Sequence, residues 1–367
     1  MKALPLVTVI MPIRNEAEFI DRSLGAVLAQ EYPASAVEIL VADGRSTDGT
    51  RQRLESIRER HANLRLIDNP GRIVSTGMNA ALAEARGEVI VRVDGHCEIA
   101  PDYLRNGVRH LLEEGVDGVG GPLDTVGETA TARAIAAAMS SGFGVGGAAF
   151  RTGRSGDRRV DTVAFPAYTR QAVMRAGAFD EELVRNQDDE YNYRLRKLDG
   201  RIRLAADMRA RYYSRSTFRS LWRQYFQYGF WKVRVLQKHP RQMQARQFVP
   251  PLFVLALAAT ACAAPAIAPA RMLLAAVAGS YLVANLLGAG WTARRHGWRH
   301  LLRLPIAFAF LHLSYGMGFL VGLARFAHRF QDRRGRVPEL AMPPVHGLED
   351  ARASDVPPQS GGLSSAP

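Results

Sequence analysis

Short apolar runs alternate with helical patterns through the first third of the chain. The runs have the length and the Val, Ile and Leu content of buried strands, and they cover residues 6–11, 37–42, 64–68 and 89–93. Residues 16–30 place apolar side chains at helical spacing, at Phe19, Ile20, Leu24, Val27 and Leu28. A second helix is expected from about Asp48 to His61. Strands that alternate with helices predict an α/β fold with a parallel sheet and right-handed crossovers.

Three longer apolar runs lie toward the C-terminus. They cover residues 249–269, 272–290 and 304–324, and each is close to the roughly 20 residues that cross a hydrocarbon core. Three such runs in succession are rare in soluble proteins, so we expect a membrane region over residues 249–324. Basic residues precede the first run and follow the second, which places both ends of this hairpin in the cytoplasm.

The third apolar run conflicts with the positive-inside tendency. Five arginines follow it, at Arg325, Arg329, Arg333, Arg334 and Arg336. If the run spans the membrane, these arginines face outward against the tendency. If it is re-entrant or lies in the interface, they stay in the cytoplasm. We predict three spans and keep the interfacial arrangement as the alternative.

The charge of the chain is concentrated in one segment. The formal net charge is +13, and ten Lys or Arg residues but no Asp or Glu lie between Met208 and Arg246. Nine aromatic residues lie between Tyr212 and Trp231. Basic and aromatic side chains together suit either nucleic acid or a membrane surface. Because apolar runs follow directly, we interpret residues 208–246 as an interfacial segment at a membrane and expect no nucleic-acid partner.

The two ends of the chain and its cysteines indicate the cellular compartment of residues 1–240 and a disordered C-terminal tail. The first residues lead straight into a strand, so we expect no signal peptide. Cys97 and Cys262 are too few for a disulfide framework, which fits a reducing cytoplasm around residues 1–240. After Gly335 the chain is rich in Pro, Ser and Gly, which predicts a disordered tail over residues 337–367.

Acidic residues follow the predicted strands at the points where they end. Asp43 follows one strand, Asp94-Gly95-His96 follows another, and Asp188-Asp189-Glu190 forms a run further on. In an open α/β sheet this edge binds ligands. Asp43 could accept from a ring N–H of a base, or belong to a plain Asp-Gly turn. Asp94 suits Mg²⁺ or Mn²⁺, whereas His96 could ligate Mn²⁺, bond a phosphate, or pack.

Four ordered segments carry a resemblance to a known family: VTVIMPIRNEAEFIDRSL, VADGRSTDGT, NAALAEARGEVIVRVDGHCEIAPDYL and NQDDEYNYRLRKLDG. Over residues 5–235 the chain resembles family 2 glycosyltransferases, and among them the bacterial membrane-associated, succinoglycan-type exopolysaccharide glucosyltransferases. The resemblance implies a glycosyltransferase type A fold, with a Rossmann-like nucleotide-binding sheet and C-terminal transmembrane helices. It also implies a nucleotide-diphosphate sugar donor, a divalent metal, and inversion at the anomeric carbon.

The resemblance also assigns residues to the donor site. Residues 1–120 correspond to the nucleotide-sugar half and residues 121–205 to the acceptor half. Glycines cluster from Gly115 to Gly156, where we expect an active-site loop rather than a phosphate loop. Metal ligation falls to Asp94 and His96. The implied nucleotide-sugar contacts are Pro12, Arg14, Asn15, Glu16, Asp43, Arg72, Asn79, Asp94 and Gly95.

Inverting transfer requires a base that takes the proton of the acceptor hydroxyl. By the family pattern Asp188 is the base and Glu190 the later acid, with Asp189 as a competing base. A charged helix N-terminus is the structural alternative, and it is compatible with catalysis. Gln224, Gln227 and Tyr228 occupy the place of the Gln-x-x-Arg-Trp motif, which contacts diphosphate or acceptor in processive relatives. The degenerate match argues against a processive enzyme, and Arg215 or Arg223 could supply the missing charge.

Together these features predict an inverting, non-processive glycosyltransferase. It transfers a hexose, expected to be glucose, from a UDP-sugar to a lipid-linked oligosaccharide. Its catalytic domain lies on the cytoplasmic side of the bacterial inner membrane, and its membrane region is multi-pass. One alternative is a polyprenyl-phosphate sugar synthase, although a bare lipid phosphate needs no base. Another is a membrane-anchored sugar-nucleotide-binding protein with a decayed site, which His96 and the degenerate Gln224–Tyr228 motif suggest.

Overall fold

The computed structural model describes residues 4–152 and 158–345. Within them an eight-stranded mixed sheet runs in the order β3-β2-β1-β4-β9-β6-β10-β8. Its strands are β1 Val7–Ile13, β2 Val37–Asp43, β3 Leu64–Asp68, β4 Val89–Arg92, β6 Gly118–Gly121, β8 Arg158–Arg159, β9 Ala164–Thr169 and β10 Ile202–Leu204. The four predicted strands are confirmed as β1 to β4, and they pair in parallel. A smaller sheet contains β5 Cys97–Ile99, β11 Ala210–Tyr213 and β7 Leu123–Val126.

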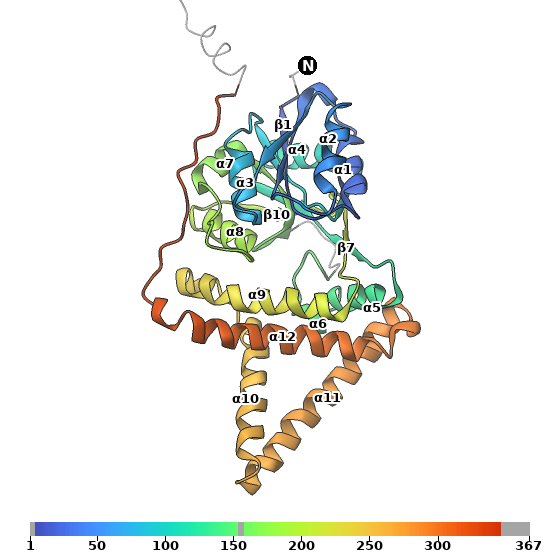
Figure 1. Ribbon diagram of the computed structural model, residues 1–367, viewed down its shortest axis with the longest axis vertical. Helices are drawn as coiled ribbons and strands as arrows, with labels where there is room; N and C mark the ends of the chain where they lie inside the picture. Colours follow the sequence, from blue (N-terminus) through green and yellow to red (C-terminus); the bar gives the residue numbers. More distant parts are fainter. Residues whose placement is uncertain (1–3, 153–157, 346–367) are drawn as a thin grey trace, which may run out of the picture.

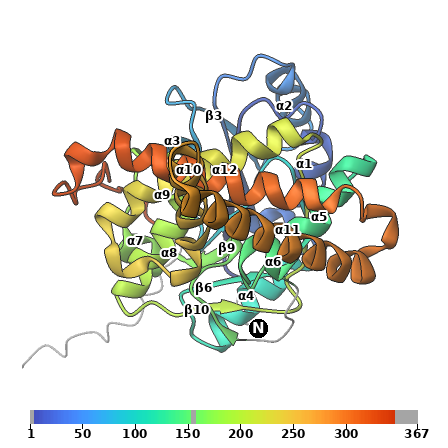
Figure 2. The same cartoon turned by 90° about the horizontal axis from the view of Figure 1, so that it is seen from below.

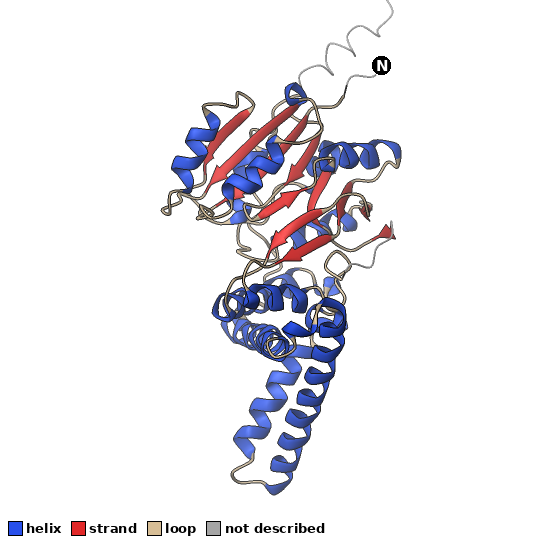
Figure 3. Cartoon of the chain, turned by 90° about the vertical axis from the view of Figure 1, so that its right-hand side faces the viewer, coloured by secondary structure: helices blue, strands red, loops and turns tan. Residues whose placement is uncertain are grey.

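Helices pack on both faces of the large sheet (Figures 1 and 3). They are α1 Ile20–Leu28, α2 Thr50–Arg58, α3 Val74–Leu82, α4 Tyr103–Glu113, α7 Arg170–Ala176 and α8 Gln187–Lys197. Helices α5 Ala130–Met139 and α6 Gly142–Val145 lie instead at the base of the molecule, beside the long C-terminal helices (Figure 1). Side chains alternate along a strand, so neighbouring residues of β1 face opposite cores. Val9 and Met11 belong to the cluster under α1 and α4, and Ile10 belongs to the cluster under α3, α7 and α8.

The first helix begins later than its pattern predicts. Helix α1 starts at Ile20 rather than Glu16. Asn15 has a positive φ of 55°, and the backbone N–H groups that follow bond to side chains of the β2–α2 loop. Glu16 N donates to Thr50 Oγ1 at 2.9 Å, for example. These tertiary bonds hold residues 14–19 as a loop.

Four long helices form the C-terminal part: α9 Phe218–Lys238, α10 Val249–Ala263, α11 Ala268–His296 and α12 Leu304–Arg325. Helices α10 and α11 project away from the α/β domain as a hairpin, whereas α12 lies beside α9 across the base of that domain (Figures 1 and 2). In the described chain, three helices are long and apolar enough to cross a membrane, and each overlaps one predicted segment, although the first ends at Ala263 rather than at residue 269.

Helix α12 is packed differently from the other two apolar helices. In α12, 44% of the most apolar stretch is buried within the protein, whereas in α10 and in α11 only 11% of that stretch is buried. A Cβ added to Gly229 of α9 would lie 2.0 Å from the Tyr315 carbonyl oxygen, and one added to Gly318 of α12 would lie 2.0 Å from that of Phe226. Such close backbones require glycine. This packing matches the interfacial alternative for the third segment, and the count of three spans stays a prediction.

The chain after α12 corrects one prediction. Disorder was expected from residue 337, yet residues 331–345 run as an extended segment along the side of the α/β domain (Figure 1). Arg336 N donates to Asp180 Oδ1 at 2.8 Å, and Pro343 O accepts from Arg170. Leu340 and Met342 pack against the core. Composition could not reveal these partners, and the remainder of the predicted tail lies outside the described residues.

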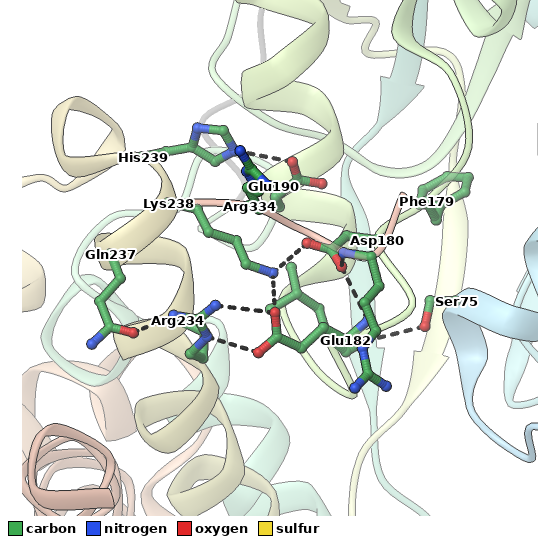
Figure 4. A network of polar contacts seen from close by, with 12 residues as sticks. Ser75, Phe179, Asp180, Glu182, Glu190, Arg234, Gln237, Lys238, His239 and Arg334 are labelled. Atoms are coloured by element: carbon green, nitrogen blue, oxygen red, sulfur yellow. Dashed lines mark hydrogen bonds and ion pairs between the residues drawn. The ribbon is translucent and has the colours of Figure 1, made fainter. Parts of the chain in front are cut away.

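A buried ion-pair network joins α9 to the loop before α8 (Figure 4). Lys238 bonds to Asp180 and, at 2.7 Å, to Glu182. Arg234, which is 0% exposed, bonds to both oxygens of Glu182 at 2.8 and 3.1 Å. The predicted interfacial segment therefore turns part of its charge inward, onto the protein. Burial acts to raise the pKa of Glu182, but hydrogen bonds from Arg234 and Lys238 outweigh it and lower that pKa to about 2.

Substituting Gly318 by Val should separate α9 from α12, because the new side chain meets the Phe226 carbonyl. We expect a loss of about 1–3 kcal/mol in the free energy of unfolding, measured by denaturation in detergent micelles. Gly279→Val on α11 is the control, since nothing lies within 4 Å of its added Cβ. Equal losses in the two variants would contradict the close packing of α9 and α12.

Glu182→Gln should change the pH dependence of stability. A carboxylate whose folded pKa is lowered stabilises the fold above its unfolded pKa, and this contribution disappears as pH falls from 4.5 toward 2. The variant should lose about 3–5 kcal/mol at neutral pH, because the buried cations Arg234 and Lys238 each lose one of their two carboxylate partners. It should also show a flatter stability curve between pH 4.5 and 2. Denaturation measured across this pH range tests the prediction, with Glu59→Gln, at an exposed position, as the control. Parallel stability curves for the unmodified protein, Glu182→Gln and Glu59→Gln would refute the prediction.

Candidate functional site

A cavity of about 770 Å³ opens at the carboxyl ends of β1 and β4. Its size falls in the range of small-molecule sites. The lining comes from the loops after β1, β3 and β4, from Phe150 and Arg151, from residues 184–188, and from the start of α9. The structure thus gathers segments from both predicted halves of the domain and from the basic aromatic segment.

The loop after β1 forms one wall, with Pro12, Arg14, Asn15 and Glu16 lining the cavity as predicted. The Asn15 side chain accepts from Thr47 N at 2.9 Å, which fixes the loop in its positive-φ conformation. Arg14 Nη1 donates to the Arg72 carbonyl at 3.3 Å, and Arg72 also lines the cavity. Two guanidinium groups therefore stand on this wall, where an anionic group of a ligand can be bound.

Two predicted donor residues have other roles in the structure. Asp43 is 2% exposed and is not among the residues that line the cavity. Its carboxylate accepts from Ser46 Oγ at 2.6 Å and supports the wall from behind. The side-chain amide of Asn79 bonds to the backbone of Phe179: its Nδ2 donates to the carbonyl oxygen at 2.9 Å, and its Oδ1 accepts from the N–H at 2.7 Å. Both side chains are thus bonded within the protein, and their direct contacts with a nucleotide stay a prediction.

The turn after β4 carries the predicted metal ligands. Asp94 accepts two bonds from Arg92, at 2.8 and 3.1 Å. His96 Nδ1 lies 2.9 Å from Glu16 Oε1, which leaves Nε2 as the nitrogen that can bind a ligand. Gly95 lies between Asp94 and His96. A Cβ added to Gly95 would lie 2.7 Å from Glu16 Cγ, so the close approach of this turn to Glu16 favours glycine.

A divalent metal fits these residues with few protein ligands. Among the described residues no group of three or more His, Cys, Asp or Glu side chains could hold a metal. Asp94 and His96 would therefore supply its protein ligands, and oxygens of a diphosphate and water would complete the shell. The bond from His96 to Glu16 is the support that metal-binding imidazoles commonly have.

The three consecutive carboxylates point to three different places. Successive residues of a helix lie about 100° apart, so they cannot share one site. Among Asp188, Asp189 and Glu190, which all belong to the described residues, only Asp188 lines the cavity. Asp189 forms an ion pair with Lys232 of α9. Asp188 Oδ2 lies 3.9 Å from Arg92 Nη1, so Arg92 stands between Asp188 and Asp94.

Glu190 is an anchor between helices. It is 2% exposed, bonds to Arg194 at 2.9 and 3.0 Å, and lies 3.0 Å from His239 Nε2. Burial acts to raise the pKa of Glu190, but the hydrogen bond with His239 and the charge of Arg194 lower it below its ordinary value. Glu190 is therefore held as a buried carboxylate away from the cavity.

Helix α9 supplies its predicted residues to the cavity. Gln224, Gln227 and Tyr228 all line it. Gln224 Nε2 donates to Tyr228 Oη at 2.9 Å, and Gln227 Oε1 accepts from Arg185 at 3.0 Å. The charge predicted near this motif comes from Arg215, which lines the cavity, whereas Arg223 is exposed outside it.

One cavity residue, Arg151, was missed by the sequence analysis. Its guanidinium lies over the ring of Tyr212, 5.4 Å from the centroid. Its Nη1 is buried, and within the described residues it has no hydrogen-bond partner. It lies next to Phe150 in a stretch rich in glycine and alanine, so only the fold brings it beside Tyr212. The glycine-rich stretch was the one available signal.

The chain is similar in sequence to known glycosyltransferases. Residues 8–182 match the family described as Glycosyl transferase family 2. The succinoglycan biosynthesis protein ExoA of Rhizobium meliloti is 31% identical over 332 residues, which are 88% of this chain and 96% of that protein. A dolichyl N-acetyl-alpha-D-glucosaminyl phosphate 3-beta-D-2,3-diacetamido-2,3-dideoxy-beta-D-glucuronosyltransferase of Methanococcus voltae is 26% identical over 240 residues, which are 63% of this chain and 74% of that protein.

The fold is similar to that of a solved enzyme, the mannosyltransferase PcManGT from Pyrobaculum calidifontis in complex with GDP-Man and Mn²⁺. The TM-score is 0.54 at 23% identity, over 83% of this chain and 87% of that one. This similarity confirms the predicted glycosyltransferase type A fold. Because the similarity to the succinoglycan protein extends over nearly the whole of both chains, and residues 8–182 match the family pattern, the chain belongs to glycosyl transferase family 2.

Proposed function

We propose that this protein is an inverting, non-processive glycosyltransferase that adds one hexose, glucose, from a UDP-sugar to a lipid-linked oligosaccharide. The observation that carries this proposal is the divergence of the three carboxylates. Asp188 alone opens into the cavity that Asp94 and His96 also line. One free acid beside a diphosphate and metal site is the arrangement that inverting transfer needs.

The donor is bound along the β1 and β4 loops in this proposal. Arg14 and Arg72 contact its anionic groups, and Asn15, Glu16 and Gly95 shape the wall around it. Asp94 and His96 hold the metal, which when bound supplies charge stabilisation to the leaving diphosphate. Arg92 is fixed by Asp94 and so sets the distance between this site and Asp188.

Asp188 acts as the base in the proposed reaction. Its carboxylate takes the proton from the acceptor hydroxyl as that oxygen attacks the anomeric carbon. The new glycosidic bond forms on the face opposite the breaking bond to the diphosphate, so the configuration inverts. Asp189 and Glu190, which the sequence left as candidates, are occupied by Lys232 and by Arg194 with His239, and we assign them supporting roles.

The acceptor enters from the α9 side. Arg151 and Arg215 bring positive charge there, and neither has an acidic partner among the described ion pairs. Tyr212 and Tyr228 line the cavity on this side. The Methanococcus voltae relative is named for transfer to a dolichyl-phosphate-linked sugar, which supports a lipid-linked acceptor. The Rhizobium meliloti relative is named for succinoglycan biosynthesis, which supports a role in exopolysaccharide synthesis.

The membrane placement follows from the apolar helices. Large side chains are exposed along α10 and α11, among them Leu252, Leu255, Leu282 and Leu287. Water would not solvate such a surface without cost, whereas lipid would. We propose that α10 and α11 anchor the protein in the bacterial inner membrane, with the catalytic domain on the cytoplasmic side.

A polyprenyl-phosphate sugar synthase is the second candidate. Arg151 and Arg215 would also suit a bare lipid phosphate, and this observation alone favours it. Supplying purified protein with UDP-glucose and either lipid-linked oligosaccharide or polyprenyl phosphate separates the two, by UDP release and by the mass of the lipid product. Donor binding by calorimetry without turnover on either acceptor would instead indicate a binding protein with a decayed site.

Asp188→Asn should lower kcat by about 10²–10⁴-fold while the calorimetric affinity for the donor stays unchanged, because the variant loses a base but no donor contact. UDP release under saturating substrates measures this effect. Asp199→Asn, at an exposed position, is the matched control and should act like the unmodified protein. Full turnover by Asp188→Asn would reject the base assignment.

His96→Asp should change the metal preference. Imidazole nitrogen is a better ligand for Mn²⁺ than for Mg²⁺, whereas a carboxylate suits both. Chelation should abolish UDP release in the unmodified protein, and Mn²⁺ should restore it at about tenfold lower concentration than Mg²⁺. In the variant the two half-saturating concentrations should approach one another. An identical ratio in both proteins would exclude His96 as a ligand.

A further inference from the structure

Helix α9 provides a basic partner for most of the acids that surround the proposed base. Asp180 bonds to Lys238, Glu182 to Arg234 and Lys238, Asp189 to Lys232, and Glu190 to His239. Figure 4 shows three of these carboxylates facing α9. Asp188 bonds to none of these cations within the described chain, and its nearest cation is Arg92 of β4. The pairing leaves one acid of this segment open to the cavity.

The pair of Lys232 and Asp189 is built into the protein. Lys232 is 3% exposed, and its Nζ contacts the Asp189 carboxylate and, at 3.3 Å, Gln242 Oε1. Gln242 Nε2 in turn donates to the Asp189 carbonyl at 3.2 Å. Both the side chain and the backbone of Asp189 are therefore held from the α9 side.

Asp189 is in turn bonded to the proposed base. Its backbone N–H donates to Asp188 Oδ1 at 2.9 Å. The contacts thus run from Lys232 and Gln242 through Asp189 to one oxygen of Asp188. The other oxygen, Oδ2, lies toward Arg92. A shift of Asp189 would move the Asp188 carboxylate relative to Arg92.

The pair also removes a competing charge. Two ionised carboxylates on adjacent residues repel one another, and a bonded ammonium offsets this repulsion. The charged and titratable groups facing Asp188 are Arg92 of β4, Tyr168 of β9 and Arg151. Those facing Asp189 are Lys232 and Tyr315 of α12. Without Lys232, Asp189 would remain a negative charge beside Asp188 with no cation of its own.

We propose that Lys232 is a positioning residue for sugar transfer: by binding Asp189 it fixes and isolates Asp188 as the acid that faces the acceptor. The proposal rests on the proposed role of Asp188 as base. It places the control of the reactive carboxylate on α9, the helix that packs along α12 beside the membrane hairpin. It also gives the buried lysine a reason beyond packing, since an apolar residue would fill the same space at lower cost.

The test is the pH profile of kcat/KM. Lys232→Met should lower kcat about tenfold and move the acid limb of the profile upward by about one pH unit, with an unchanged KM for the donor. Lys238→Met is the matched control, because it removes another buried lysine of α9 whose partners are Asp180 and Glu182. It should lose stability but keep the acid limb. A limb that moves equally in both variants would overturn the proposal.

A double variant guards against failure to fold. Asp189→Asn with Lys232→Gln removes both charges and keeps two hydrogen-bonding side chains, so it leaves no unpaired ion. It should fold and return the acid limb to within about half a pH unit of the unmodified profile. A folded double variant that keeps the displaced limb would show that the pair does not act through charge, and would overturn the proposal.

Asp188→Asn separates this proposal from the proposed function. If Asp188→Asn is fully active, the base assignment fails whatever Lys232 does. If Asp188→Asn is inactive while Lys232→Met keeps the unmodified pH profile, the base assignment stands and the positioning role of Lys232 alone is rejected.

Discussion

Burying a cation is tolerated only where a carboxylate meets it with good geometry, and this constraint orients the helices around the site. Removing a charge from water costs several kcal/mol, which a well-placed partner must offset. Lys232, Arg234 and Lys238 of α9 are each at most 6% exposed, and all three have acidic partners. These pairs hold α9 against Asp189 of α8 and against Asp180 and Glu182 of the loop before α8. The position of α12 then depends on that of α9, since its glycines Gly318 and Gly322 pack directly against the α9 backbone.

That orientation shapes the cavity. The N-terminal half of α9 brings Gln224, Gln227 and Tyr228 to the cavity, and its C-terminal half binds the acids of the 180–190 segment. The same helix therefore closes the site and decides which carboxylate remains free. The extended segment after α12 returns to Asp180, so the chain on both sides of the apolar helices is attached to one loop. The cavity is in this way joined physically to the apolar helices of the C-terminal part.

Much of the fold could be predicted from local pattern. The strands β1 to β4 and the three apolar helices have strong periodicity or long apolar runs, which short-range sequence encodes. The cavity residues after β1 and β4 followed from their place at strand ends. Asp43 and Asn79 also have suitable chemistry, but Asp43 bonds to Ser46, three residues along the chain, and Asn79 bonds to the backbone of Phe179, 100 residues away. Arg151 was missed, and residues 337–345 were taken as disordered, because their partners are distant in sequence.

The sequence by itself determined the kinds of element, their order, and the presence of acids where hydrophobic strands end. These features depend on side-chain periodicity and on neighbours within a few positions. Only the tertiary structure decided which acid faces the cavity and which direction the basic segment turns. Asp189 and Lys232 are 43 residues apart, and Glu182 and Arg234 are 52 apart. The energy of such pairs depends on distance and burial in space, so no local pattern in the chain can reveal it.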